Sequence, residues 1–310
     1  MRVYRHALVF ASGCALLFAA LSCGCRNTGR DSGYGELVDR LGEITEGKPG
    51  SFGVAVITDD ADTIVFNNSS CYPMMSMFKL PEAIAVCHVL DMRQQDLDSA
   101  LTVRRSDLDE HTWSPMLKDY AGEEFTVTVG RLLDYILIDS DNNASNILFD
   151  RIVSTAETDS YMRIILPESD FRIVHKESEM KADIMKSYDN CTSPLSYACL
   201  VDRLFKENIV SDVKQKEIIR AMTVCNTGMD RIAAGLPESD GVVFAHRTGS
   251  GYTNSRGEVI AVNDGGYVRL PSGKGYSIAV LVKDFGGMQE EAEKIIAEIS
   301  GAVYESIIKR

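Results

Sequence analysis

Three short groups of polar residues have the types and the spacing that nucleophilic chemistry needs. In the first, Ser76 and Lys79 stand three residues apart at the start of a segment, 75–90, that is apolar at helical period. This spacing puts both side chains on one helix face, where a neutral lysine amine could take the proton of the serine hydroxyl. Free backbone N–H groups at a helix N-terminus could also stabilise an oxyanion there. Serine and lysine are common, so this pair alone is a weak signal.

The second group is Ser140, Asp141 and Asn142, between two segments with helical periodicity, 129–138 and 142–153. A short polar loop in this position can direct one hydroxyl and one amide into a cleft while the aspartate caps the next helix. Helix capping alone would also account for the tripeptide if it stood by itself.

The third group, residues 246–251, follows a segment with the character of a strand. The edge of a strand offers backbone N–H and C=O groups to a ligand, and Gly249 and Gly251 allow a close approach. Arg247 and Thr248 would add a cation and a hydroxyl. On its own, this group could equally be an ordinary strand end.

Apolar periodicity indicates strands at both ends of the chain and helices between them. The runs 52–57 and 63–66 predict a hairpin. Further strands are expected at 241–245, 259–263, 266–270 and 276–283, and further helices at 37–44, 194–206, 211–224 and 290–308. One sheet must then join the two ends, with the helical part inserted into it. We therefore expect a discontinuous α/β domain (36–70 and 225–310), a helical domain (71–224), and an active site in the cleft between them.

Composition and charge exclude several classes of protein. The 310-residue chain has 32 Lys and Arg residues against 45 Asp and Glu residues, a formal net charge of −13, and no basic stripe. This charge repels phosphates and anionic headgroups, so nucleic-acid binding is not expected. The histidines form no H-x-x-x-H pair and the cysteines no C-x-x-C, so we expect no metal and no other cofactor. Five cysteines beyond residue 25 are expected as free thiols: Cys71, Cys87, Cys191, Cys199 and Cys225.

Residues 1–25 have the composition of an export signal. Arg2 and Arg5 precede an apolar run that is shorter than the roughly 20 residues of a bilayer span. Small residues close the segment around Cys23 and Cys25. Either cysteine could be the lipidated residue of a lipoprotein, and plain cleavage of the signal is the alternative. We therefore expect an exported, periplasmic protein that acts as a monomer, either released or anchored to a membrane by lipid.

Taken in order, the three polar groups resemble the signature of the penicillin-recognising serine hydrolases. From about residue 37 to its end, the chain is similar to a class A β-lactamase, and most of all to the divergent branch found in Bacteroidetes. Other segments that agree with this resemblance are 113–116, 126–130, 142–146, 227–232 and 235–237. The fold that the resemblance implies is an antiparallel sheet flanked by helices, with an inserted helical domain.

The resemblance also implies roles for individual residues. Ser76 would attack the lactam carbonyl, Lys79 would help to remove its proton, and Ser140 would pass a proton to the departing lactam nitrogen. Backbone N–H groups of Ser76 and Ser250 would form the oxyanion hole. Asn142 would hold the side-chain amide of the substrate. Trp113 would line the mouth of the cleft, and four residues would bind the substrate's carboxylate, the last of them across a turn: Arg247, Thr248, Ser250 and Arg256.

Hydrolysis further requires a base that activates water against the acyl-enzyme. The resemblance places this glutamate in segment 175–181, where we choose Glu177 and keep Glu179 as the alternative register. The asparagine that usually follows the glutamate by four residues is replaced here by Lys181. This cation could pair with Glu177 and lower its pKa, which would weaken the base, or it could point to solvent.

We therefore expect a serine β-lactamase, a hydrolase acting on cyclic amides, that confers resistance to penicillin- and cephalosporin-type antibiotics through an acyl-enzyme. Its partner would be the small β-lactam substrate. Lys181 keeps two alternatives open. One is a penicillin-binding DD-peptidase or another acyl-enzyme former that deacylates slowly. The other is a catalytically inactive binding lipoprotein of the same fold.

Overall fold

The computed structural model of the chain describes residues 33–69, 71–238 and 241–309. The expected export signal, with Cys23 and Cys25, lies outside the described residues. Among the described helices, none combines the length and the apolar character needed to cross a bilayer.

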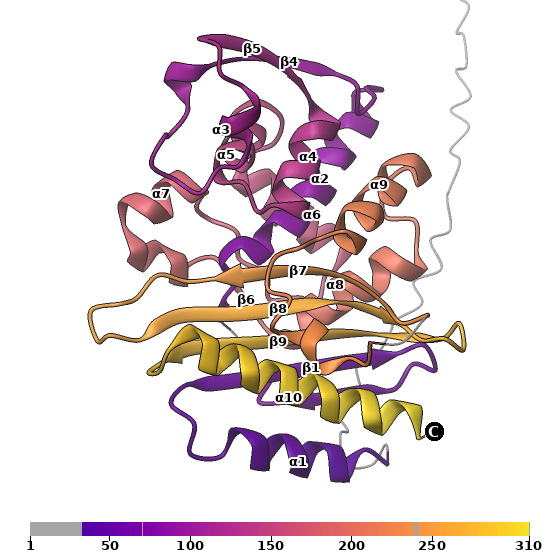
Figure 1. Cartoon of the computed structure of the whole chain (residues 1–310). Coiled ribbons are helices and arrows are strands. Elements are labelled where there is room, and N and C mark those ends of the chain that lie inside the picture. Colours follow the sequence, from indigo (N-terminus) through magenta and orange to yellow (C-terminus); the bar gives the residue numbers. More distant parts are fainter. Residues whose placement is uncertain (1–32, 70, 239–240, 310) are drawn as a thin grey trace, which may run out of the picture.

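A five-stranded antiparallel sheet joins the two ends of the chain, as the sequence predicts (Figure 1). Its strands follow the order β2-β1-β9-β8-β7. Strand β1 from the N-terminal part pairs with β9 from the C-terminal part, with Ala55 opposite Ala279. The bounds are β1 (Ser51–Thr58), β2 (Thr63–Phe66), β7 (Val243–Ser250), β8 (Val259–Arg269) and β9 (Gly275–Phe285).

Two predicted strand boundaries are wrong. The strands expected at 259–263 and 266–270 are one continuous strand, β8, because its central glycines fit the ladder rather than break it: a Cβ at Gly266 would lie 2.1 Å from the carbonyl oxygen of Ala245. The strand expected to end at Ala245 continues as β7 through Ser250. The third polar group therefore lies within an edge strand of the sheet, and not after it.

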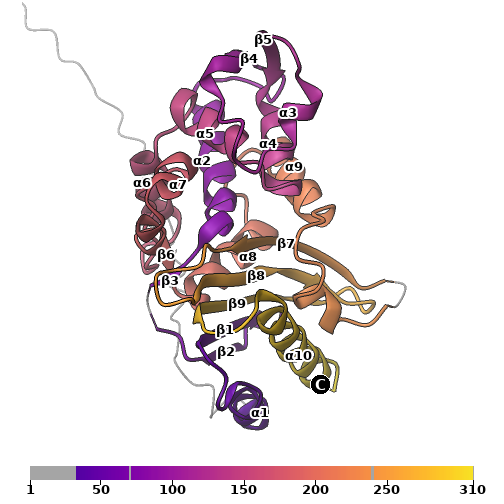
Figure 2. The same cartoon turned by 60° about the vertical axis from the view of Figure 1, so that its left-hand side comes forward.

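The two faces of the sheet bury different sets of side chains. Along β1, Val54 and Val56 pack with Leu41 and Ile296, whereas Ala55 packs with the core of the helical part. This alternation follows from the period of two of a strand. Helices α1 (Gly35–Thr45) and α10 (Gln289–Ile308) cover the first face, and the helical part stands on the other, as Figure 2 shows from a second side.

The helical part surrounds helix α2 (Lys79–Met92), which is buried on nearly all sides over its first nine residues. This helix contains a proline, Pro81. Pro81 is tolerated because it is the third residue of the helix, where the backbone N–H has no partner within the helix. The other helices are α3 (Met116–Asp119), α4 (Val129–Ile138), α5 (Asn142–Arg151), α6 (Thr155–Ile165), α7 (Glu177–Ala182), α8 (Pro194–Lys206) and α9 (Asp212–Thr223), with the short 3-10 helices η1 (Met75–Phe78), η2 (Arg105–Asp107), η3 (Ile184–Tyr188) and η4 (Ile232–Gly235). Two small ladders pair β3 (Tyr72–Pro73) with β6 (Cys191–Thr192) and β4 (Ala100–Arg104) with β5 (Glu124–Thr128).

Helices α4 and α8 have the predicted bounds, and α5 and α9 end within two residues of them. Helix α6 has no counterpart in the prediction, because it buries only Thr158, Tyr161 and Met162 and so shows little apolar period. Its start does carry a signal in the sequence: Ser154 and Glu157 form a capping box around the first turn.

Candidate active site

Ser76 is held at the junction of the sheet and the helical part. It lies in η1, the 3-10 turn that leads into α2, between Met75 and Met77, which are buried. The helix predicted from residue 75 therefore begins with a tighter turn. Met75 has a φ of 47°, an unusual backbone conformation for a residue with a side chain, and such strain tends to occur at functional sites.

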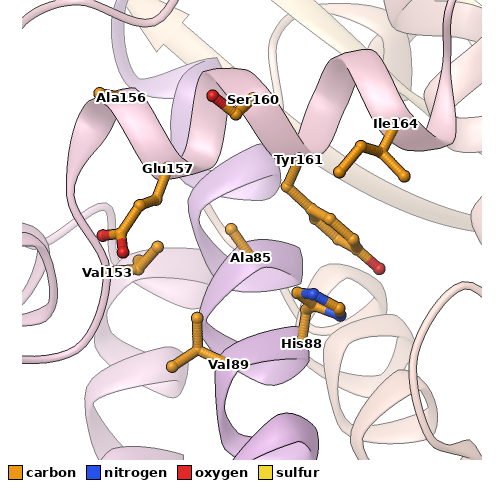
Figure 3. Close-up of a pocket in the computed structure, with 9 residues that line it drawn as sticks. All are labelled: Ala85, His88, Val89, Val153, Ala156, Glu157, Ser160, Tyr161 and Ile164. Atoms are coloured by element: carbon orange, nitrogen blue, oxygen red, sulfur yellow. The ribbon is translucent and has the colours of Figure 1, made fainter.

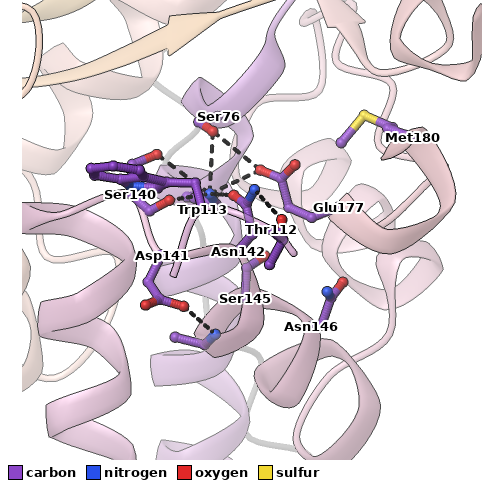
Figure 4. Close-up of polar contacts among 12 residues, drawn as sticks. Ser76, Thr112, Trp113, Ser140, Asp141, Asn142, Ser145, Asn146, Glu177 and Met180 are labelled. Atoms are coloured by element: carbon purple, nitrogen blue, oxygen red, sulfur yellow. Dashed lines mark hydrogen bonds and ion pairs between the residues drawn. The ribbon is translucent and has the colours of Figure 1, made fainter. Parts of the chain in front are cut away.

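The Lys79 ammonium contacts four residues of the polar cluster, all of which Figure 4 labels: Ser76, Ser140, Asn142 and Glu177. Its Nζ is 3.2 Å from Ser76 Oγ, 2.8 Å from the carbonyl oxygen of Ser140 and 2.7 Å from Asn142 Oδ1. It also forms an ion pair of 2.8 Å with Glu177 Oε1. Burial lowers the pKa of Lys79, and the Glu177 carboxylate opposes this shift. The predicted Ser76–Lys79 contact is present, and three further predicted residues, Ser140, Asn142 and Glu177, contact the same amine.

Of the two candidate glutamates, the structure brings Glu177 to the serine. Glu177 begins α7, is 5% exposed, and its Oε1 accepts a hydrogen bond of 3.1 Å from Ser76 Oγ. The side chain of Glu179 instead turns back to accept a hydrogen bond from the backbone N–H of Lys176.

Asn190 holds the loop that carries Glu177. Its Oδ1 accepts hydrogen bonds of 2.8 Å from the N–H groups of Val174 and His175, and its Nδ2 donates to the carbonyl oxygen of His175. The Cys191 backbone closes the same loop by exchanging two hydrogen bonds with Arg172. The sequence prediction does not include Asn190, because an isolated asparagine has no spacing that marks it.

Lys181 takes neither of the two positions expected from the sequence. Its Nζ pairs with Asp109 Oδ2, and the hydrogen bond from this lysine is the main cause that lowers the pKa of Asp109. The cation that faces Glu177 is Lys79. Lys181 thus fixes the segment before Trp113 to α7 instead of neutralising Glu177.

The loop between α4 and α5 is shaped by a capping aspartate. Asp141 is fully buried, and its Oδ1 accepts a hydrogen bond of 2.9 Å from the N–H of Ala144, so the predicted cap is present. Ser140 adopts a φ of 61°, which sets its side chain against the Lys79 amine. Asn142 Nδ2 donates to Thr112, and the Trp113 ring is 63% exposed beside this loop (Figure 4).

A buried arginine on β7 faces the same loop. Arg247 is fully buried, and its guanidinium donates to Ser140 Oγ and, over 3.4 Å, to Thr227 Oγ1. Thr227 Oγ1 lies 2.6 Å from Thr248 Oγ1. No carboxylate pairs with Arg247 among the described residues, and its Nε has no hydrogen-bond partner there. An unpaired buried cation is costly, so this arrangement favours an anionic ligand.

The second arginine beside this strand is not the predicted one. Arg256 is exposed and pairs with Glu258 and Asp284. Arg231, which is 2% exposed, instead donates a hydrogen bond of 2.6 Å to Ser250 Oγ. In the sequence, no spacing connects Arg231 to this strand, and only the packing of η4 brings it there.

A surface pocket between α2 and α6 has none of this chemistry. It encloses about 360 Å³, and none of the predicted site residues lines it (Figure 3). Its His88 and Tyr161 rings stack on each other, and the Glu157 carboxylate serves the capping box of α6. Because no polar groups converge there, the Lys79 cluster is the better candidate for the active site.

The chain is similar to proteins of known family. The sequence matches the model of the β-lactamase enzyme family over residues 36–307. A β-lactamase of Phocaeicola vulgatus is 46% identical over 273 residues, covering 88% of this chain and 85% of the relative. The extended-spectrum β-lactamase PER-1 of Pseudomonas aeruginosa is 32% identical over 275 residues, covering 88% of each.

Solved structures show the same fold. The TLA-3 extended-spectrum β-lactamase superposes with a TM-score of 0.85 at 32% identity, over 88% of this chain and 98% of that one. A class A β-lactamase from Bacteroides cellulosilyticus superposes with a TM-score of 0.82 at 28% identity, over 89% and 98%.

Proposed function

Because this chain belongs to the β-lactamase enzyme family, with the fold of its class A members, we propose that it hydrolyses penicillin- and cephalosporin-type antibiotics through a serine acyl-enzyme and so confers resistance. The family resemblance and the fold class predicted from the sequence are confirmed. The observation that carries the proposed mechanism is the buried Lys79 Nζ, which contacts Ser76, Ser140, Asn142 and Glu177 at once.

In acylation, the Ser76 hydroxyl attacks the lactam carbonyl. Its proton has two acceptors within reach, Glu177 Oε1 at 3.1 Å and the Lys79 amine at 3.2 Å. Burial favours the neutral amine and the glutamate favours the ammonium, so the two groups share the role of base. The oxyanion is received by the N–H groups of Ser76 and Ser250, because β7 packs closely against η1.

The departing lactam nitrogen needs a proton. Ser140 Oγ lies 3.4 Å from Lys79 Nζ, so the proton removed from Ser76 can pass through Lys79 to Ser140. Arg247 donates a hydrogen bond to the same hydroxyl oxygen, which leaves the hydroxyl hydrogen of Ser140 available to the nitrogen.

Deacylation is assigned to Glu177. In the free enzyme its Oε1 accepts the Ser76 hydrogen bond. An acylated serine has no hydrogen to donate, so this oxygen becomes available to take a proton from water that attacks the ester. Because Lys181 is paired with Asp109, it does not compete for Glu177.

We expect Lys181→Gln to change kcat for a penicillin by no more than about twofold, since the partly exposed pair with Asp109 contributes little and does not touch Glu177. Steady-state kinetics checks this. Lys176→Gln is the matched control, because Lys176 lies in the same segment as Lys181 and also pairs with an aspartate, Asp150. A large fall in kcat with accumulation of acyl-enzyme in the Lys181 variant alone would show that Lys181 does support Glu177.

The substrate's carboxylate is assigned to Arg247, Thr248 and Ser250, with Arg231 orienting the Ser250 hydroxyl. The buried guanidinium of Arg247 supplies the positive charge. Its Nε has no hydrogen-bond partner among the described residues, so this cation has no anionic partner until the carboxylate binds. Asn142 is assigned to the side-chain amide of the substrate and Trp113 to the mouth of the cleft.

We expect Arg247→Gln to raise KM about 10- to 100-fold, because a charged hydrogen bond to the carboxylate is lost. Arg256→Ala should leave KM within about twofold, since that side chain is exposed and pairs with Glu258 and Asp284. Initial rates over a range of substrate concentrations separate the two, and thermal melting tests whether the Arg247 variant is folded. An equal rise of KM in the Arg256 variant would restore Arg256 as a binding residue.

The function is tested by mixing the purified protein with a chromogenic cephalosporin. We expect many turnovers per enzyme molecule. A burst of one equivalent followed by a stable covalent adduct would instead indicate a penicillin-binding protein, and no adduct at all would indicate a binding lipoprotein.

We further propose that residues 1–25 export the protein to the periplasm, with lipidation at Cys23 or Cys25 as an alternative to plain cleavage, and that it acts as a monomer without a cofactor. The active site is assigned to the cleft between the 71–224 helical domain and the α/β domain formed by 36–70 and 225–310. Retention of enzyme in the membrane fraction would distinguish the lipoprotein from a released enzyme.

A further inference from the structure

Two cysteines with no part in the proposed reaction lie where the chain enters and leaves the catalytic region. Cys71 directly precedes β3, a few residues before Ser76. Cys191 begins β6, at the end of the loop that carries Glu177. Figure 2 shows β3 and β6 together at one end of the sheet, below α7.

The ladder between β3 and β6 fixes the spacing of the two residues. Pro73 pairs with Cys191 and Tyr72 with Thr192, so Cys71 is the diagonal neighbour of Cys191. Such neighbours lie about 7–8 Å apart between Cα atoms, just beyond the usual range of a disulfide, so closing the bond requires a small shift of the backbone. Both thiols are free in the structure, and the side-chain interaction with Cys71 contributes to the raised pKa of Cys191.

The two thiols differ in access. Cys71 is half-buried, so a small oxidant can reach its sulfur. Cys191 is fully buried, and burial, followed by the contact with Cys71, raises its pKa. Because the thiolate is the nucleophile in disulfide exchange, Cys191 reacts slowly once the protein is folded. Oxidation is therefore faster during folding, before Cys191 is enclosed.

We propose that Cys71 and Cys191 form a disulfide that ties the segment leading to Ser76 to the base of the Glu177 loop. A disulfide reagent, either a protein disulfide oxidoreductase or oxidised glutathione, accepts the two electrons. One thiolate attacks it to form a mixed disulfide, and the second thiolate displaces the reagent's other half. Two protein thiols are thereby oxidised, and their two electrons and two protons pass to the reagent, which is reduced to two thiols.

The bond would have a large effect on the unfolded chain. It closes a loop of about 120 residues that includes α2 through α7, and the stabilisation from lost unfolded-state entropy grows with loop length. It would also join β3 covalently to β6, which is already connected to Arg172 by two backbone hydrogen bonds. Both ends of the Glu177 loop would then be fixed to the strand before Ser76.

Peptide mapping tests the bond directly. The full chain is refolded in a glutathione redox buffer, unfolded in denaturant with N-ethylmaleimide so that every remaining thiol is blocked, and digested with trypsin and chymotrypsin, which cut between Cys191 and Cys199 at Leu195 or Tyr197. We expect a linked pair of peptides carrying Cys71 and Cys191, with maleimide on Cys87, Cys199 and Cys225. Maleimide on both Cys71 and Cys191, or a linkage that involves another described cysteine, would overturn the proposal.

Thermal melting gives a second readout. Reduction by dithiothreitol should lower Tm by about 10 °C, and oxidised Cys71→Ser should melt at the temperature of the reduced protein. Cys199→Ser is the matched control and should keep the full shift. If dithiothreitol lowered the Tm of Cys71→Ser as much as that of the unchanged chain, the bond would not be the cause. Both measurements can be repeated on a Ser76→Ala background, so they do not depend on β-lactam hydrolysis.

Discussion

Replacing Ser76 by alanine is expected to reduce the turnover of a chromogenic cephalosporin by about 10⁵-fold or more, because it removes the atom that forms the acyl-enzyme. Lys79, Ser140 and Glu177 would remain in place, but they act as a unit with the nucleophile and cannot replace it. The loss is measured as the steady-state rate of ring opening, and mass spectrometry of the intact protein should show no covalent adduct.

The matched control for this variant is Ser106→Ala. Among the described residues, the exposed Ser106 hydroxyl bonds only to Asp107, so activity should be unchanged. Both variants should melt close to the unchanged protein, since Ser76 contributes its hydroxyl contacts with Lys79 and Glu177 and no large apolar surface. Appreciable turnover by a folded Ser76 variant would show that another residue is the nucleophile and would refute the acyl-enzyme mechanism proposed for this site.

Replacing Glu177 by glutamine should trap the acyl-enzyme. An amide cannot take a proton from water, so deacylation should slow by about 10² to 10⁴-fold. Acylation should continue, because the Glu177 carboxylate raises the pKa of Lys79 and its removal favours the neutral amine. Quenched mixtures should therefore contain enzyme with one substrate covalently attached, after a burst of one equivalent.

Glu179→Gln is the control from the same loop. Its carboxylate bonds to the backbone of Lys176, so it should deacylate at the normal rate and lose only some loop stability. The reverse result, with the adduct accumulating in the Glu179 variant, would mean that the loop has the other register in the working enzyme. Normal turnover by both variants would leave the base unidentified and contradict its assignment to this loop.

The sequence predicted well those features that depend on neighbours in the chain. The β1–β2 hairpin follows from alternating apolar residues, and the contact of Ser76 with Lys79 follows from their spacing on one turn. The same reasoning failed for β8, which it divided into two strands on either side of the stretch that contains Gly265. Gly265 and Gly266 lie at the middle of the continuous strand. In the fold these glycines are required, because β7 lies too close to Gly266 to admit a side chain.

Contacts between distant segments could not be predicted in this way. Arg256 was chosen because a turn could return it toward Arg247, but Glu258 and Asp284 bind it first. Arg231 reaches Ser250 from η4, which is positioned by its packing against α10. The partner of Lys181 could not be predicted either, since Asp109 lies 72 residues before it in the chain.

The pairing of β1 with β9 sets the order in which the protein can fold. During synthesis, β1 can form its hairpin with β2 early, but its other edge stays open until residues 275–285 have been made. Pairing between such distant segments is slow, and an open strand edge is a site for aggregation. The helical part can collapse around α2 before then, yet β7, with Arg247 and Thr248, reaches its final position only when β8 and β9 complete the sheet. The site assigned to substrate binding is therefore complete only when the C-terminal strands have paired.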